Sequence, residues 1–272
     1  MIPQIAPRKR RPTNMRADSM DPAAHQLARD YYDEVAPDYD RSMRREGDLI
    51  DRREKELLQL TLGDLSGRRV LDFGCGTGRI SLFHRRQGAA EVVGVDVSPR
   101  MIDMARAKLA GTDAAAGVEF RVFEPAAVVA PSGEAAEPFD VVTSLEVLEY
   151  FAEPAEFFAT LSRHVAPGGH VVFDFLNRHH LPCRLKSYLS RQWRESGLRL
   201  HSLGDVHRMC AAADLDVLTT SGVFMSLLPL SIHAKLPLLG TRWSSVERVL
   251  DRSTLLRRVL SYRVLVAAQK RA

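Results

Sequence analysis

The chain has 272 residues, enough for one domain or one domain with additions, and 45% of them are hydrophobic, as in an ordinary globular protein. No apolar run approaches the roughly 20 residues that span a bilayer, and no apolar segment of a signal peptide follows the basic start. We therefore expect neither a membrane span nor a signal peptide. The three cysteines, Cys75, Cys183 and Cys210, are odd in number and lack metal-binding spacing, which favours a reducing cytoplasm.

The net charge of +4 is distributed unevenly along the chain. Residues 1–16 carry +5 and residues 234–272 carry +7, so residues 17–233 carry −8. Nucleic acid normally requires a basic face around the site, so this distribution argues against nucleic acid as a partner. Residues 1–20 also hold three prolines and show no periodicity. We predict a disordered basic tail, either solvated or in weak contact with an anionic membrane surface.

Two helices are predicted before the first strand. One begins near Ala23, with Asp21 as its cap and Pro22 in its first turn. The other covers residues 48–62, where leucines supply the apolar positions. It is expected to pack on a sheet whose first strand is residues 69–73.

Residues 69–108 predict a strand, a glycine-rich turn, a helix and a second strand, which together make one βαβ unit. The first apolar run contains Asp72 and leads into Gly74, Gly76 and Gly78, and the second, residues 91–96, ends in Asp96. Glycines permit positive φ and close approach of a ligand to the backbone. An acid at the end of the second strand can accept both hydroxyls of a ribose. A further helix begins at Pro99, capped by Ser98.

A dinucleotide fold requires G-x-G-x-x-G, whereas here the third glycine comes one position early. Asp72 would repel a pyrophosphate but suits a ligand that carries an ammonium group. The pattern D-x-G-x-G-x-G resembles the class I S-adenosyl-L-methionine (SAM)-dependent methyltransferases. A glycine turn that binds no ligand is the alternative.

The resemblance implies a role for each residue of this unit. Asp72 would interact with the methionine ammonium group of SAM, directly or through water, and Asp96 would hold the ribose. The glycine turn would give the donor room, and the start of the next helix would touch the ribose and adenine. The implied SAM-binding residues here are Asp72, Gly74, Cys75, Gly76, Gly78, Asp96, Val97, Ser98 and Met101.

The third strand is predicted over residues 118–123. The family usually ends it with an aspartate that accepts from the adenine amino group, and this chain has Glu124 there. The fourth strand and its exit, residues 138–150, resemble the family's fourth motif, although the family often has histidine at Tyr150. Leu145 would face the methionine part of SAM. We interpret Glu146 and Glu149 as exposed or capping acids in preference to proton acceptors.

A helix over residues 154–165 is predicted to stop at Pro167-Gly168-Gly169, followed by a fifth strand over residues 170–175. A helix over residues 204–213 precedes a sixth strand, residues 215–224. In the resembled family the last strand, here residues 262–268, inserts antiparallel between its neighbours. The resemblance therefore implies an α/β fold: a Rossmann-like, seven-stranded, mostly parallel sheet with helices on both faces.

The phrase at residues 28–40 resembles the N-terminal segment of ubiquinone- and menaquinone-type small-molecule methyltransferases. In that family it folds over the SAM pocket, so residues 21–65 would form a helical lid on a domain covering residues 21–272. The candidates for lining the site are Tyr31, Tyr32 and Tyr39. The alternative is that these tyrosines only pack the helix onto the domain.

The proton acceptor is predicted at His179 or His180, which directly follow the fifth strand at the sheet edge where ligands bind. They could equally be rim histidines, with His233 as the next candidate or no base at all. Residues 225–260 form an apolar and basic insertion whose latter part, residues 242–260, is predicted as one amphipathic helix. It would be either a lid or a surface that docks on a membrane.

These features predict a cytoplasmic enzyme that transfers a methyl group from SAM and releases S-adenosyl-L-homocysteine (SAH). A location peripheral to the membrane is the alternative, in which the basic segments bind lipid. The predicted acceptor is a small, rather apolar molecule, with a hydroxyl of a quinol, phenol or polyketide-like product first. An N- or C-methyltransferase and a SAM-binding protein without turnover are the alternatives. No metal is expected, because no cluster of carboxylates and histidines stands out.

Overall fold

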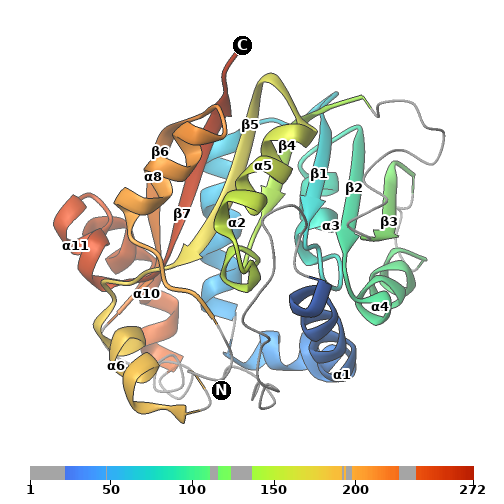
Figure 1. The fold of residues 1–272 in the computed structure, drawn as a ribbon. Coiled ribbons are helices and arrows are strands. Elements are labelled where there is room, and N and C mark those ends of the chain that lie inside the picture. Colours follow the sequence, from blue (N-terminus) through green and yellow to red (C-terminus); the bar gives the residue numbers. More distant parts are fainter. Residues whose placement is uncertain are drawn as a thin grey trace.

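The computed structural model of the protein describes residues 22–46, 48–110, 116–123, 137–191, 193, 198–226 and 237–272. One seven-stranded sheet has the order β3-β2-β1-β4-β5-β7-β6 (Figure 1). Its strands are β1 (Arg69–Phe73), β2 (Glu91–Asp96), β3 (Val118–Val122), β4 (Phe139–Ser144), β5 (Val165–Leu176), β6 (Leu215–Met225) and β7 (Ser261–Lys270). The predicted fold class is confirmed: β1 to β5 are parallel, and β7 inserts antiparallel between β5 and β6.

Helices cover both faces of the sheet because successive strand residues point to opposite sides. On β1, Val70 packs in the cluster that includes α4 (Pro99–Ala110), whereas Leu71 and Phe73 pack toward α5 (Pro154–His164) and α8 (Leu203–Ala212). Helices α2 (Asp48–Leu62) and α3 (Arg79–Arg86) share the face of α4. Strands that are buried on both faces read as continuous apolar runs, which explains why the observed bounds of β1 and β2 match their predictions.

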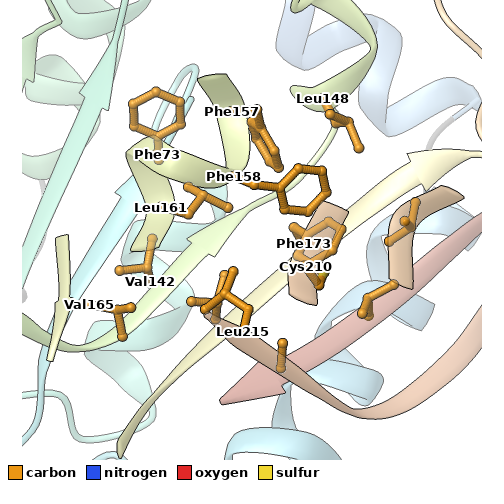
Figure 2. Close-up of a cluster of buried hydrophobic side chains, with 14 of the residues drawn as sticks. Phe73, Val142, Leu148, Phe157, Phe158, Leu161, Val165, Phe173, Cys210 and Leu215 are labelled. Atoms are coloured by element: carbon orange, nitrogen blue, oxygen red, sulfur yellow. The ribbon is translucent and has the colours of Figure 1, made fainter. Parts of the chain in front are cut away.

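Figure 2 shows the cluster between the sheet and helices α5 and α8. Phe157 and Phe158 of α5 are fully buried, and their rings contact the ring of Phe173 on β5 at centroid distances of 5.9 and 5.2 Å. Burial of one such side chain stabilises the fold by roughly 1.5–3 kcal/mol. This packing fixes α5 and, with it, the short connection from β4, residues 145–153.

Strand β5 begins earlier than predicted. Helix α5 ends at His164, within one residue of its prediction, but β5 starts at Val165 instead of residue 170, so the Pro-Gly-Gly phrase lies inside the strand. Phe139 of β4 pairs with Val165, and the next paired residue, Val141, is opposite His170. The intervening residues form a bulge, which the positive φ of 75° at Gly168 accommodates.

The insertion before β7 also differs from its prediction. Two helices, α10 (Pro237–Leu250) and α11 (Thr254–Leu260), replace the single helix expected over residues 242–260. The chain turns at Asp251, whose carboxylate accepts from the Gly222 amide and from the Arg53 and Arg257 side chains. Ser253 then caps α11. Among the described residues, no helix is both long and apolar enough to cross a membrane.

Helix α1 (Pro22–Glu46) lies at the carboxyl edge of the sheet, beside α4 (Figure 1). It begins where the sequence predicted and continues through Pro37 to Glu46. The Asp33 carboxylate accepts from the Ser98 hydroxyl at 2.5 Å, and the Asp40 carboxylate accepts from the Thr77 hydroxyl at 2.7 Å. These contacts attach α1 to the ends of the loops that follow β1 and β2.

Candidate functional site

A cavity of about 870 Å³, including its part open to solvent, lies at the carboxyl ends of β1, β2 and β4. We call it the main cavity. A smaller space of about 370 Å³, the side recess, adjoins it and shares several lining residues with it. These shared residues are Tyr39, Gly74, Gly76, Leu145 and Glu146. The site therefore joins the loops after β1 and β4 to helix α1.

The glycine turn after β1 has three positive φ values: 79° at Gly74, 53° at Gly76 and 79° at Gly78. A Cβ on Gly74 would lie 2.2 Å from Val147, and one on Gly78 would lie 2.6 Å from Phe120. A Cβ on Gly76 would meet nothing within 4 Å. Gly74 and Gly76 line both spaces, whereas Gly78 lines neither and serves helix packing. Only Gly76 therefore leaves space that a ligand could use.

Asp96 lies at the end of β2 with its side chain in the wall of the main cavity. Its carboxylate accepts from the Gly76 amide at 2.8 Å and from the Ser98 amide at 2.9 Å. Burial raises the pKa of Asp96 to about 6, against the lowering effect of these two hydrogen bonds. Val97 and Met101 line the same cavity, whereas the Ser98 hydroxyl bonds to Asp33 and the Met101 amide.

Asp72 lies on β1 and lines the side recess together with Cys75. The carboxylate is buried and accepts from the Ser81 hydroxyl at 2.6 Å and the Thr143 hydroxyl at 3.2 Å. Burial raises its pKa, and these hydrogen bonds oppose the rise. Burial likewise raises the pKa of the Cys75 thiol, which is therefore neutral at physiological pH.

Arg79 brings a positive charge to the side recess. Its guanidinium donates to Asp51 at 2.5 Å and to Glu54 at 2.9 Å, both on α2. Glu54 is fully buried, and burial raises its pKa to about 8, with Arg79 opposing and Glu146 adding to the rise. The sequence prediction did not include Arg79. The sequence feature that could have indicated Arg79 is its position directly after the last glycine of the turn.

Three tyrosines meet at the main cavity. Tyr32 and Tyr39 come from α1, and Tyr150 comes from the short helix η3 (Leu148–Tyr150). The ring of Tyr32 contacts Tyr39 at 6.4 Å and Tyr150 at 5.6 Å, measured between centroids. Burial raises the pKa of all three hydroxyls. The Tyr31 ring packs on the Tyr32 ring, with 5.2 Å between centroids, and does not line the cavity. This position agrees with the alternative that Tyr31 only packs the helix onto the domain.

The connection after β4 supplies Leu145, Glu146, Val147 and Phe151 to the main cavity. Glu149 points elsewhere: it is buried and ion-paired with Arg263 at 2.7 Å. The interpretation of Glu149 as an exposed or capping acid was therefore wrong, because the partner on β7 could not be read from the local sequence. Glu146 is neither a cap nor fully exposed.

Neither predicted catalytic histidine is among the residues that line the two spaces. His180 is buried, with Nε2 2.7 Å from the Ser226 carbonyl and Nδ1 3.1 Å from the Cys183 sulfur. His179 lies two residues after Asn177, and the His179 backbone amide donates to the Asn177 side-chain oxygen at 3.0 Å. Burial and nearby arginines lower the pKa of His179. Their catalytic role stays a prediction.

Two predicted residues, Glu124 and His233, lie outside the described residues, as does the tail of residues 1–20. Phe123, directly before Glu124, lines the main cavity. Within the described ranges, no group of three or more histidine, cysteine, aspartate or glutamate side chains is arranged to hold a metal ion.

The α/β sheet, glycine turn and two strand-end acids define a methyltransferase-type enzyme, and comparison with known proteins agrees. Residues 39–220 match the family model described as a methyltransferase domain, and the chain belongs to that family. It is 41% identical over 129 residues to the ubiquinone biosynthesis O-methyltransferase of Alkalilimnicola ehrlichii, covering 47% of each chain. It is 32% identical over 178 residues to the ubiquinone biosynthesis O-methyltransferase of Neisseria meningitidis serogroup C, and the match covers 61% of this chain and 71% of that one.

The chain spans about half the length of the Alkalilimnicola relative that it matches. Among solved structures, it resembles magnesium protoporphyrin IX methyltransferase from Synechocystis PCC 6803, crystallised with bound SAH. That likeness has a TM-score of 0.63 at 18% identity and covers 90% of this chain and 99% of the other. Identity this low establishes the shared fold alone.

Proposed function

We propose that this methyltransferase uses SAM to methylate a hydroxyl group of a small, rather apolar acceptor such as a quinol, phenol or polyketide-like product. The observation that carries the proposal is that one cavity is lined both by a hydrogen-bonded acid, Asp96, and by three tyrosines. The names of the relatives support O-methylation. N- or C-methylation of a small molecule is the alternative.

The residues present fit SAM. We assign Asp96 to the ribose hydroxyls, Asp72 to the ammonium group and Arg79 to the carboxylate of the methionine part. Open space at the Cβ position of Gly76 leaves room for close approach. The remaining proposed contacts are Gly74, Cys75, Val97, Met101, Leu145 and Tyr39, with Gly78 supporting the turn; Glu124 stays the candidate for the adenine amino group. We call the Asp72–Met101 part of the wall the donor side.

We assign a second group of residues that line the main cavity, Tyr32, Glu146, Tyr150 and Phe151, to the acceptor and call it the acceptor side. Its aromatic rings suit a flat, apolar molecule, while phenolic hydroxyls can orient a hydroxyl or carbonyl oxygen by hydrogen bonds. SAM supplies an activated methyl group on a sulfonium. The protein has to orient the acceptor oxygen in line with that methyl group, exclude water and take up one proton.

The test uses purified protein, methyl-labelled SAM and a panel of catechols, hydroquinones, phenols, primary amines and fatty acids. Label in the organic phase with matching SAH release is expected for a catechol or hydroquinone. Label on an amine instead would favour the N-methyltransferase alternative. Tight SAM binding without transfer to any acceptor would contradict the proposed reaction and leave a SAM-binding protein.

We also propose that the protein works in the cytoplasm and touches an anionic membrane surface through its basic segments, residues 1–20 and 242–260. Support comes from apolar side chains that α10 and α11 leave exposed near arginines such as Arg248 and Arg252. The exposed apolar residues are Val246, Val249, Leu255, Leu256 and Val259. Sedimentation with phosphatidylserine-containing vesicles, but not with neutral vesicles, is expected. Equal recovery in the supernatant from both would contradict this contact.

A further inference from the structure

Glu146 has an unusual backbone. Its φ of 61° places a side-chain-bearing residue in the left-handed region, which only two other non-glycine residues of the described chain share. Such a conformation persists only where surrounding contacts hold it, and strained residues of this kind cluster at functional sites. The contacts that hold Glu146 are therefore informative.

A buried ionic cluster holds this backbone in place. The Glu146 amide donates to Asp174 Oδ1 at 2.7 Å. Arg263 donates to both oxygens of Asp174 and, at 2.7 and 3.1 Å, to both oxygens of Glu149. Asp174, Arg263 and Glu149 are each at most 3% exposed. Burying three charges is costly, so such a cluster is better explained by the geometry that it imposes than by stability.

The cluster draws on β5, β7 and η3, so it is set by the packed sheet and not by the loop itself. Its effect is to direct the Glu146 side chain to the boundary of the two spaces. Glu146 is the only acid among the described lining residues that belongs to both the main cavity and the side recess. Asp72 lines the side recess alone, and Asp96 lines the main cavity alone.

The surroundings of the Glu146 carboxylate suit proton uptake. Glu146 lines the main cavity together with Tyr32, Tyr39 and Tyr150, and its charge contributes to the raised pKa of these hydroxyls. The carboxylates of Asp72 and Asp96, in contrast, already accept two hydrogen bonds each. His180, one of the two histidines predicted from the sequence as the base, has its ring nitrogens in contact with Ser226 and Cys183.

We propose that Glu146 accepts the proton of the acceptor hydroxyl and that the Asp174–Arg263–Glu149 cluster positions it for this task; the inference rests on the proposed function. The acceptor oxygen forms a bond to the methyl carbon as the carbon–sulfur bond breaks. The electron pair of that bond stays on sulfur, which leaves neutral SAH. The hydroxyl proton passes to the Glu146 carboxylate and from there to water, so the step needs no further reactant.

The first experiment compares wild type with Glu146→Gln, using the best hydroxyl acceptor of the panel. The matched control is Glu153→Gln, an exposed acid seven residues along the chain. We expect kcat of E146Q to fall by about 100-fold or more. SAM affinity should change by less than about threefold, because the substitution keeps the shape of the side chain and removes only its ability to take up a proton. E153Q should match wild type.

A second variant, Glu146→Gly, separates strain from chemistry. Glycine adopts positive φ freely, so E146G should unfold at a temperature equal to or above that of wild type. It should nevertheless be as slow as E146Q. A variant that is stable, binds SAM and is inactive would show that the strained residue serves the reaction. An E146G protein as active as wild type would overturn the proposal.

A third measurement does not depend on turnover. In the complex with SAH, 4-nitrocatechol reports the ionisation of its own hydroxyl by absorbance. A neighbouring carboxylate disfavours a phenolate, so the pKa of the bound probe should be lower in E146Q than in wild type, by about one unit or more. Equal values would overturn the placement of Glu146 beside the acceptor. Failure of the probe to bind would overturn the assignment of the acceptor side.

The outcomes separate the two proposals. If wild type methylates no acceptor of the panel, the proposed function fails, and this inference fails with it. If wild type methylates a phenol and E146Q does so equally fast, only the role of Glu146 fails. If E146Q loses SAM affinity more than tenfold but keeps kcat, Glu146 contacts the sulfonium and does not take up the proton.

Discussion

On the donor side of the cavity, the polar groups come from one continuous stretch, residues 72–101, whereas the acceptor side combines helix α1 with the connection after β4. Donor residues lie on or directly after β1 and β2, so the sheet itself sets their positions. The connection after β4 is held by contacts to β5 and β7. A site built from one continuous stretch can conserve the binding of one ligand. A site built from separate segments can change its acceptor through substitutions in either segment alone.

The largest expected effect on the donor side is that of Asp96→Asn. An amide cannot accept from both ribose hydroxyls as a carboxylate does, so we expect a loss of about 100-fold in SAM affinity, about 3 kcal/mol. Calorimetric titration with SAM measures it, and Asp103→Asn, an exposed acid on α4, is the control. Affinity within threefold of wild type would contradict the ribose assignment.

The pH dependence of SAM binding tests the same carboxylate. With the pKa of Asp96 raised to about 6, SAM affinity should decline as the pH falls below about 6, because the protonated acid accepts poorly. In D96N this decline should be shallower. Without ligand the sign is opposite: the native state binds more protons than the unfolded state between about pH 4 and 6, so its stability decreases as the pH rises through this range.

The glycine turn permits a comparison of two matched substitutions. Gly74→Ala would place a Cβ 2.2 Å from Val147 at positive φ, and we expect a loss of about 2–4 kcal/mol in the free energy of unfolding. Gly76→Ala meets no neighbour and should cost only about 1 kcal/mol. Its Cβ enters the donor space, however, so G76A should weaken SAM binding although it folds. Urea denaturation and calorimetry separate these effects; equal stability losses would contradict the comparison.

Sequence patterns predicted residues of the proposed donor side that the structure brings to the two spaces, because these residues follow one another in a local pattern. Asp72 lies inside the apolar strand β1, and Asp96 is the last residue of the apolar strand β2. The three glycines between these strands belong to a single turn, so their spacing can be recognised in the sequence. The ion pair of Glu149 with Arg263 joins residues 114 positions apart, which no local pattern reveals. The positive φ of Glu146 depends on the same distant partners. The break between α10 and α11 likewise depends on Arg53 and Gly222, which bind the turn at Asp251.

A smaller effect is expected for Tyr150→Phe on the acceptor side. The Tyr150 ring packs on the Tyr32 ring at 5.6 Å and thereby joins η3 to α1, and phenylalanine keeps this ring contact, so stability should change little. We expect KM for the acceptor to rise several-fold with SAM affinity unchanged. The control is Tyr188→Phe on α6 (Leu181–Leu189), where the side chain is 67% exposed. An equal change in SAM affinity would show that the two sides are not separable.

The smallest effect is expected for His179→Ala, which nevertheless decides between two candidates for the base. His179 follows β5 but does not line the cavity, and Glu146 does. If the cavity wall defines the reacting groups, H179A should keep kcat within about twofold of wild type across the pH range. A loss of 100-fold at neutral pH, with SAM affinity preserved, would instead place the proton acceptor after β5. It would also mean that the site changes shape when the acceptor binds, because His179 would have to reach the cavity from outside its present wall.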